Sequence, residues 1–587
     1  MVTDNWQIII LSIAAIIFLF IYSWYPYQVA KDTDFKFASP DETANYFWAK
    51  NYAAGLGLTY FEPLNLIADD AVTPRSVRSD NGTVKPVSFL GIILIYGWLA
   101  KTFGPWIIIY LTPLFAVIGI FCFYGITRRV FNDKIALLSA LMLFALVPYW
   151  YYAARSMFHN VLFIDLLLIG IYFLIDGTRI EQMKRIKTDF IFIFLSGIFF
   201  GLAIMTRASE LIWLAPVMLI TWLAVWRFPK PLRGFGNLKD CFLKLFIFAF
   251  GLILALLPMF YYNQVLYGGW FKFGYNRPAA VEAQSKIAVN NVNAENINGI
   301  ASSPRSAVDL LAMTKRFMPA QINIKQAGKS FINYYAIMFW HLFWPAFFGG
   351  IWLLYNWKKI DNPQKLYLVV FIISSMILGL YYGSWKIQDN PNPASFTIGN
   401  SYTRYFLPMY IMSLPLAALL IIKLSSLLSF PRKRESRVNY NEIPAFAGMT
   451  VLIVIFLILN FQAAVWGKEE GLLTMKNNLV KDAELVESMF SHIEPEAIII
   501  SERFDKFLWP KYKVIIGNLS DKSHPQAYAE LAEQGIPLYY YGFIFPPGDF
   551  AYLNSRKLAE VNLELEIIKL DEESRIGLYK LQVTSNK

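Results

Sequence analysis

Long uninterrupted runs of apolar residues are the feature that most constrains this chain. An α-helix needs roughly 17 to 25 such residues to cross about 30 Å of hydrocarbon. The composition agrees, because 56% of the 587 residues are hydrophobic and only 16% are charged, whereas soluble proteins carry about 25% charged residues. The sequence therefore predicts an all-α polytopic membrane protein. We expect about eleven transmembrane helices, at residues 6–24, 106–126, 135–152, 157–175, 189–206, 211–226, 242–262, 331–355, 366–383, 403–424 and 450–466.

The stretch 87–100 is also apolar, but it is short and bounded by Pro86 and Lys101. We interpret it as a helix lying at the membrane interface, because counting it as a span would invert everything after it. The loops then assigned to the inside carry nineteen lysines and arginines, and the short outside loops carry three. The positive-inside rule thus predicts a multi-pass protein of the plasma (inner) membrane, with a cytoplasmic N-terminus and an extracytoplasmic C-terminus. This distribution accounts for the net charge of +11 without nucleic acid as a partner.

The predicted spans divide the chain into a membrane domain, residues 1–467, and a C-terminal domain, residues 468–587. The membrane domain has two long external loops, 25–86 and 263–330. The inside loop 429–450 differs in composition from its surroundings. It resembles peptides translated from small palindromic repeats inserted into bacterial genes, so we interpret it as an insertion.

Short apolar runs in the tail predict a small extracytoplasmic α/β domain. We expect helices at 470–493 and 525–533 and strands at 497–501, 514–517, 538–541, 565–570 and 577–583. No Gly-x-x-x-Gly pair is taken as a helix-packing motif. The two cysteines, Cys122 and Cys241, indicate neither a disulfide framework nor a metal site.

The segment SPDETANYFWAKNYAAGLG, residues 39–57, follows the first span on the outer side. Ser39 as N-cap, Pro40 at the first helical position and Glu42 three residues after the cap form a capping box. On this interpretation Asp41 and Glu42 only begin a helix. Alternatively, an ionised carboxylate at the boundary of water and lipid accepts the proton of an acceptor hydroxyl while a lipid-borne group departs.

An Asp-Glu pair at the start of an amphipathic helix in the first external loop resembles the membrane glycosyltransferases of the GT-C fold. The similarity is to the group of protein O-mannosyltransferases, lipid A aminoarabinose transferases and RgtA-like enzymes, and it covers about residues 1–470. Further motifs follow in the order of that family. They are VKPVSF (84–89), WLAKTFG (98–104), ITRRVFND (126–133), MTRASELIWLAP (205–216), NQVLYGGWFKFGY (263–275) and SYTRYFLPMY (401–410).

The resemblance implies a polyprenyl-phosphate sugar as donor substrate. The enzyme would transfer a hexosyl or pentosyl group, with inversion, to a hydroxyl of a protein, lipid or glycan of the cell envelope, on the outer face. Matched residue by residue, Asp41 is the catalytic base and Glu42 its partner. Lys85, Arg207 and Arg404 match positions expected to bind the donor phosphate. Val84 stands where the aminoarabinose branch has Glu, so the donor specificity of that branch is not implied.

The residue types suit this chemistry. Negative charge develops on the departing phosphate, and fixed cations in a pocket of low dielectric stabilise it. Guanidinium groups match phosphate oxygens as forked donors. Arg155 and Arg207 are equally explained as side chains that extend from helix ends to water. Arg404 lies inside an apolar run, where a charge is expensive, which favours a function.

Two carboxylates are not a metal site, so the sequence assigns no metal ligands and leaves a divalent metal open. A lipid-linked sugar flippase or transporter would show paired Gly- or Pro-broken helices in two corresponding halves and midplane charges. Here the polar candidates gather toward one face instead. An oligosaccharyltransferase would carry a Trp-Trp-Asp signature, which this sequence lacks. A surface-polysaccharide ligase or polymerase remains an alternative, because such enzymes also join lipid-linked sugars outside.

Overall fold

A computed structural model of the chain describes most of its residues, and these form two compact units that interleave along the sequence. Unit 1 contains Met1–Pro26, Tyr110–Met259 and Ser302–Thr474, and unit 2 contains Tyr27–Ile109, Phe260–Ala301 and Met475–Lys587. The first external loop and the tail thus share one unit, whereas the predicted domains met at residue 467. Those linear boundaries stay a prediction. The described residues are 5–34, 36–177, 186–227, 238–275, 322–387, 389, 395–427, 443–467, 469–494, 496–519 and 525–584.

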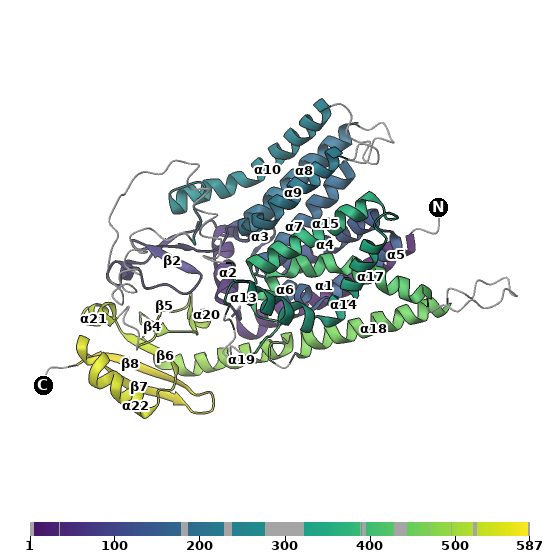
Figure 1. Ribbon diagram of the computed structural model, residues 1–587. Helices are drawn as coiled ribbons and strands as arrows, with labels where there is room; N and C mark the ends of the chain where they lie inside the picture. Colours follow the sequence, from purple (N-terminus) through teal and green to yellow (C-terminus); the bar gives the residue numbers. More distant parts are fainter. Residues whose placement is uncertain are drawn as a thin grey trace. The chain divides into compact units, whose positions relative to one another are not determined.

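Unit 1 is built from helices, and every predicted span position holds one or more of them (Figure 1). Most of the predicted insertion 429–450 lies outside the described residues, as does 276–321 of the second external loop. The helices are α1 (Asn5–Thr33), α4 (Ile108–Val130), α5 (Asp133–Ala145), α6 (Val147–Arg155), α7 (His159–Gly177), α8 (Ile186–Thr206), α9 (Leu211–Arg227), α10 (Leu238–Tyr267), α13 (Ile324–Phe331), α14 (Trp340–Tyr355), α15 (Asn362–Tyr381), α16 (Ser401–Tyr405), α17 (Leu407–Leu427) and α18 (Ile443–Trp466).

Within the described residues, five helices are long and apolar enough to cross a membrane, and the number rises to eight if each bent pair is one span. The chain is therefore a multi-pass membrane protein, and the count of eleven stays a prediction. Two predicted helices are broken. The run 135–152 bends by 52° between α5 and α6, and the run 331–355 bends by 100° before Trp340. The predicted interfacial stretch 87–100 overlaps the short helix α3 (Gly91–Phe103), which extends three residues beyond it.

One side chain, Asn460 of α18, supplies polar partners at both breaks. Its Oδ1 accepts the N–H of Val147 at 3.0 Å, at the start of α6. Its Nδ2 lies 3.0 Å from Nε2 of His341, in the first turn of α14. Backbone and ring nitrogens inside an apolar bundle need such partners, because lipid offers none. A single buried amide thus satisfies a backbone N–H at the first break and contacts a ring nitrogen beside the second.

Glycines let α8 approach α10 closely. A Cβ at Gly197 would lie 2.1 Å from the carbonyl oxygen of Phe248, and one at Gly251 would lie 2.5 Å from that of Phe194. Gly201, four residues after Gly197, meets the carbonyl of Leu252 in the same way. This pair is a Gly-x-x-x-Gly motif that works as a packing surface, so the sequence-based dismissal of such pairs was wrong.

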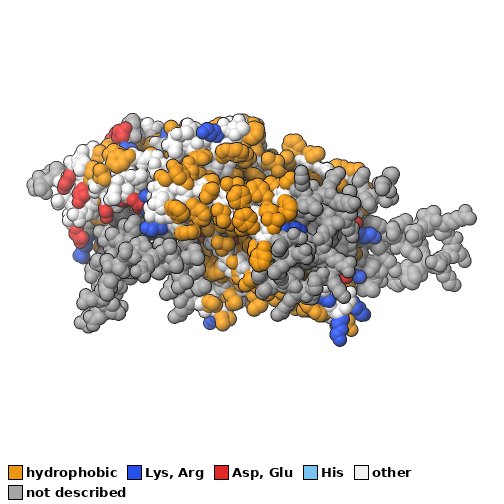
Figure 2. Space-filling model, turned by 90° about the horizontal axis from the view of Figure 1, so that it is seen from above, with side chains coloured by type: hydrophobic (Ala, Val, Ile, Leu, Met, Phe, Trp, Pro, Cys, Tyr) orange, Lys and Arg blue, Asp and Glu red, His pale blue; other side chains and the backbone are white. Residues whose placement is uncertain are grey.

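The outer surface of α10 is apolar. Phe246, Phe250, Ile253 and Leu257 are all half exposed or more. Figure 2 shows hydrophobic side chains gathered in a broad area with few charged side chains among them. Exposed apolar side chains in such numbers are unfavourable in water and are what hydrocarbon requires.

Unit 2 begins with a small sheet and two helices. The antiparallel strands β1 (Tyr60–Phe61), β3 (Thr83–Pro86) and β2 (Val77–Asp80) lie in the order β1-β3-β2. Helix α2 (Pro40–Ala53) packs on α3, where a Cβ on Gly97 would lie 2.9 Å from the carbonyl oxygen of Ala49. This close approach fixes the position of α2, which carries the predicted base.

The tail forms a five-stranded sheet with the order β5-β4-β6-β8-β7. Each predicted strand is present, and the predicted helix 525–533 has those bounds. Strand β4 is parallel to both neighbours, and β8 is antiparallel to β6 and β7. The elements are α19 (Leu472–Met489), β4 (Ile498–Ser501), α20 (Asp505–Leu508), β5 (Lys513–Ile516), α21 (Pro525–Glu533), β6 (Leu538–Phe543), α22 (Pro547–Tyr552), β7 (Leu563–Asp571) and β8 (Ile576–Val583).

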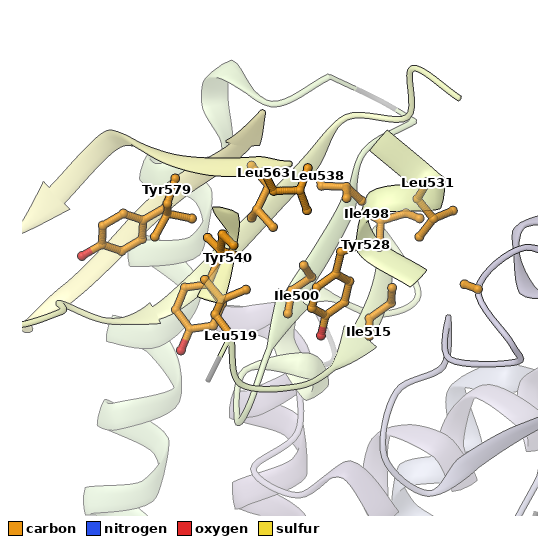
Figure 3. Close-up of a cluster of buried hydrophobic side chains, with 14 of the residues drawn as sticks. Ile498, Ile500, Ile515, Leu519, Tyr528, Leu531, Leu538, Tyr540, Leu563 and Tyr579 are labelled. Carbon is orange, nitrogen blue, oxygen red and sulfur yellow. The ribbon is translucent and has the colours of Figure 1, made fainter. Parts of the chain in front are cut away.

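The core of this sheet is closed by the first external segment. Figure 3 shows Ile498, Ile500 and Tyr540 from the strands facing Tyr528 and Leu531 of α21. Ala68 and Val72, from the loop before β2, are buried in the same cluster. The tail and the first external segment therefore share one hydrophobic core.

Replacing Gly197 by alanine should destabilise the protein by about 1 to 3 kcal/mol, because the new methyl group would overlap the carbonyl of Phe248. Thermal unfolding in detergent measures the effect. Gly328→Ala is the matched control, since a Cβ there meets nothing within 4 Å. Equal melting temperatures for the two variants would contradict the close packing of α8 and α10.

Stability of the tail should depend on the ionisation of Glu494. Hydrogen bonds from the hydroxyl of Tyr539 and from Nζ of Lys580 (2.9 Å) lower the pKa of Glu494. A lowered pKa stabilises the fold above the unfolded value of about 4.3, and this stability is lost as the pH falls through the folded pKa. Since the side chain is 43% exposed, the contribution is at most about 1 kcal/mol. We expect Glu494→Gln to unfold at a lower temperature than the native chain at pH 7, and the difference to shrink as the pH falls through the folded pKa. A difference that does not change with pH would exclude the ionised pair as its cause.

Candidate active site

Helix α2 begins with the predicted acidic pair. Ser39 is the N-cap and Pro40 follows at the first helical position, as the sequence predicts. The Ser39 hydroxyl accepts the N–H of Asp41 at 3.3 Å, one residue earlier than a capping box requires. Glu42 is 1% exposed, whereas Asp41 is only partly buried. The more accessible carboxylate of the pair is thus the one predicted to be the base.

Asp41 is held by a residue that sequence reasoning missed. The hydroxyl of Ser76 donates to Oδ1 of Asp41 at 2.5 Å. Ser76 has a φ of +64°, a left-handed conformation that is uncommon for a serine. A hydrogen bond to a carboxylate fixes the orientation of the group.

Burial shifts the pKa of two side chains, one on α2 and one just before it. Burial, with a smaller contribution from the charge of Asp34, raises the pKa of Tyr46 to about 12. Burial also lowers the pKa of Lys36, against the opposing effect of Asp34. Tyr46 is therefore a neutral phenol at physiological pH.

Lys85 lies on β3 and is already engaged. Its Nζ donates to the carbonyl oxygen of Leu266 at 2.7 Å and lies 2.6 Å from Oδ2 of Asp80. The same carboxylate pairs with Arg78, which faces Lys85 across the β2–β3 ladder. A phosphate at Lys85 would therefore have to share that cation with Asp80. Neither Asp80 nor Arg78 was predicted as part of a site.

Two of the motifs in the predicted order come together in unit 2. The hydroxyl of Tyr267 donates to the carbonyl of Pro86 at 2.8 Å. Arg78 Nη1 donates to the carbonyl of Gly274 at 2.9 Å. A Cβ on Gly274 would lie 2.3 Å from the carbonyl oxygen of Val87, so only glycine fits there. The motifs 84–89 and 263–275 thus form one packed structure.

Unit 1 brings the motifs 205–216 and 401–410 together with Arg155, in a group that we call the arginine cluster, made of Arg155, Arg207 and Arg404. Shared rings connect them. Arg207 and Arg404 lie over Tyr405 at 4.7 and 5.3 Å from its centroid. Arg404 and Arg155 both lie 4.7 Å from the centroid of Phe158. Two rings therefore link three guanidinium groups.

Each arginine of the cluster also has a polar partner. Nε of Arg207 lies 2.6 Å from Oε1 of Glu210, which also accepts the hydroxyl of Tyr382 at 2.7 Å. Arg404 Nη2 donates to the hydroxyl of Ser401 at 2.8 Å. Arg155 Nη1 donates to the hydroxyl of Tyr151 at 3.1 Å. Glu210 is buried, so it balances the charge of Arg207 inside the helices. The sequence offered Glu210 three residues after Arg207 as a signal for this pair.

The predicted site residues thus fall into two groups. Asp41, Glu42 and Lys85 belong to unit 2, and Arg207 and Arg404 belong to unit 1. Their catalytic and phosphate-binding roles stay predictions.

The sequence assigned no metal ligands and left a divalent metal open, and the question stays open in the structure. Within the part of the chain that the structure describes, no three His, Cys, Asp or Glu side chains gather as a metal would require. An Asp-x-Asp spacing, Asp32-Thr33-Asp34, lies at the end of α1, and the sequence-based conclusion that the chain has no such motif was wrong. Asp32 forms an ion pair with Lys476 at 2.9 Å.

A family model and several solved structures match this chain. Residues 88–261 match the family model described as dolichyl-phosphate-mannose-protein mannosyltransferase. No curated protein matches the sequence at a significant level. Among solved structures, the apo oligosaccharyltransferase of Archaeoglobus fulgidus is 14% identical. Its alignment covers 95% of this chain and 71% of that one, with a TM-score of 0.53.

Two further structures resemble this chain. The Archaeoglobus fulgidus oligosaccharyltransferase AglB in complex with an inhibitory peptide and a dolichol-phosphate is 12% identical, covers 98% and 74% of the two chains and gives a TM-score of 0.51. ArnT from Cupriavidus metallidurans bound to undecaprenyl phosphate is 12% identical and covers 100% of both chains, with a TM-score of 0.45.

The likeness to the oligosaccharyltransferase extends over nearly the whole chain but at low identity, so it shows the fold alone. The sequence has no Trp-Trp-Asp signature. The match of residues 88–261 comes from a second group of membrane glycosyltransferases. The chain is therefore a multi-pass membrane protein with the GT-C fold, related to glycosyltransferases.

Proposed function

We propose that this chain is an integral-membrane glycosyltransferase that uses a polyprenyl-phosphate sugar. It moves a hexosyl or pentosyl group to a hydroxyl of a protein, lipid or glycan of the cell envelope, on the outer face of the membrane. The observation that carries the proposal is the GT-C fold over 95% of the chain. A dolichol-phosphate in the complex of AglB supports a lipid-linked donor.

In the proposed reaction, Asp41 accepts the proton of the acceptor hydroxyl. The acceptor oxygen forms a bond to the anomeric carbon as the bond from that carbon to the phosphate oxygen breaks, and polyprenyl phosphate leaves. Attack opposite the leaving group inverts the anomeric centre. Partial exposure of Asp41 and its hydrogen bond from Ser76 support this role. Glu42, buried beside it, acts as its partner.

The arginine cluster is proposed to stabilise the departing phosphate. Rings on Phe158 and Tyr405 hold the guanidinium planes, so little reorganisation is needed when charge develops. Glu210 neutralises part of the positive charge of Arg207. Arg404, whose guanidinium lies over both rings, is proposed to bind the phosphate. Lys85 is proposed to bind the donor phosphate by exchanging its contact with Asp80.

Replacing Asp41 by asparagine should reduce transfer by about 10²- to 10⁴-fold, since the amide cannot accept the proton. The measurement is turnover of radiolabelled polyprenyl-phosphate sugars by the purified chain in lipid, with cell-envelope acceptors. Donor affinity should remain within about twofold, because Asp41 contacts the acceptor in this proposal.

Three outcomes separate the alternatives. Full activity of Asp41→Asn would reduce Asp41 to the start of a helix. Movement of lipid across the bilayer without transfer from any donor would identify a flippase or transporter. Extension of a lipid-linked glycan in the assay would identify a surface-polysaccharide ligase or polymerase.

Replacing Arg404 by glutamine should lower donor affinity and turnover together, by about 10- to 100-fold, because a charge-assisted contact to phosphate is lost. Glu210→Gln is the comparison, since it removes the buried carboxylate that pairs with Arg207 and keeps all three arginine side chains. Binding of labelled polyprenyl phosphate measures the difference. Equal losses in both variants would mean that the cluster serves only to hold the helices together.

A further inference from the structure

The tail touches the predicted catalytic helix next to the base. On one side of Asp41, Nζ of Lys506 donates to the carbonyl of Ala38 at 2.7 Å. On the other side, the hydroxyl of Thr43 lies 3.5 Å from the carbonyl of Lys506. The ring of Trp509 lies 4.2 Å from that of Phe47, one turn further along α2. These contacts come from α20 and from Trp509, which follows it. The tail therefore contacts α2 and the residue before its N-cap at several points.

A second connection runs through Asp505, the first residue of α20, which is 0% exposed. Its Oδ2 accepts the backbone N–H of Arg75 at 2.9 Å, and its Oδ1 accepts Nε and Nη2 of that arginine at 3.0 and 2.5 Å. Nη2 of Arg75 also donates to the carbonyl of Arg503 at 2.9 Å. One buried carboxylate thus fixes both the backbone and the side chain of Arg75.

The residue after Arg75 is Ser76, whose hydroxyl donates to Asp41. Its left-handed φ of +64° is unfavourable for a residue with a Cβ and persists only where neighbours determine it. On one side Asp505 holds the N–H of Arg75, and on the other the carbonyl of Ser76 accepts the N–H of Val87 at 3.4 Å. The strained backbone aims the hydroxyl at the carboxylate.

We infer that the tail is a positioning element of the active site, acting through Asp505, Arg75 and Ser76 on the carboxylate of Asp41. This inference rests on the proposed function, in which Asp41 is the base. Asp505 lies just beyond the carboxyl end of β4, in the parallel part of the sheet, where open α/β sheets commonly place functional groups. Here it holds a loop from the first external segment instead of a ligand.

Burial of an ion pair does not by itself indicate function, because such pairs also serve folding. The effect of losing Asp505 on turnover distinguishes a structural role from a positioning role. If Asp505 only stabilised the tail, its loss would lower the amount of folded protein and leave the turnover of each folded molecule unchanged. If it positions Asp41, its loss lowers turnover in protein that is folded and binds donor.

The test is the transfer assay with Asp505→Asn and Ser76→Gly. In the first variant, the amide places an N–H donor against the donors of Arg75. In the second, glycine accepts the left-handed φ without strain, so only the hydroxyl is lost. We expect each change to lower kcat by roughly 10- to 100-fold and to leave the donor KM within about twofold. Glu494→Gln, which removes an ion pair of the tail that does not involve α20 or Arg75, should keep the native kcat.

The double variant Ser76→Gly with Asp505→Asn makes the test specific. Changes along one path are not additive, so we expect its kcat to equal that of the slower single variant. A kcat of the double variant that is reduced by the product of the two single losses would overturn the inference. So would native turnover in both single variants while Asp41→Asn is inactive. Absence of transfer by the native chain itself would instead overturn the proposed function. Thermal unfolding and binding of labelled polyprenyl phosphate confirm that each variant is folded, and Arg75→Lys replaces Asp505→Asn if that variant does not fold.

Discussion

Every backbone N–H and C=O inside hydrocarbon must find a partner within the protein, and this constraint shapes unit 1. Continuous helices meet it automatically. The interruptions need help, as Asn460 shows by accepting the N–H of Val147 where α5 and α6 meet. The ends that interruptions create also carry the negative end of the helix dipole, which favours cations. Arg155 closes α6, Arg207 follows α8 and Arg404 lies in the last turn of α16. All three arginines of the cluster thus lie at the C-terminal ends of helices, where the helix dipole favours a cation.

Three guanidinium groups connected through two rings repel one another unless something compensates the charge. Part of the compensation is the carboxylate of Glu210, and part is the negative face of Phe158 and Tyr405. Rings offer no full charge, so they stabilise the cations without neutralising them. Cations held in this way keep their positive charge, which supports the proposal that the cluster binds a phosphate.

Sequence reasoning succeeded where a signal is local. Helix positions in the membrane follow from apolar length, and the N-cap Ser39 and the strands of the tail follow from short patterns. It failed where the cause is distant. Asp505 and Arg75 are 430 positions apart, and no local pattern connects them. The breaks of 135–152 and 331–355 were missed because apolar length gives no information on direction.

Two features that the sequence-based prediction missed do have a weak signal in the sequence. Gly197 and Gly201 are spaced as a packing motif, yet their meaning depends on Gly251 in another helix. Asp32 and Asp34 have a spacing that attracts attention, but only the structure shows Asp32 paired with Lys476.

No sequence motif indicates the contacts of the tail with α2, because backbone atoms supply several of them. Lys506 accepts through its backbone carbonyl, which any residue supplies, and its ammonium binds the carbonyl of Ala38, which any residue also supplies. The side chains of Asp505 and Arg75 and the hydroxyl of Ser76 are specific to the path, but Asp505 lies far from the other two in the sequence. Meanwhile α3 holds the opposite side of α2 through Gly97, where a side chain would collide with Ala49. A helix fixed on two sides by backbone contacts has little freedom to rotate, so the direction of the Asp41 carboxylate is set by the fold of unit 2 as a whole.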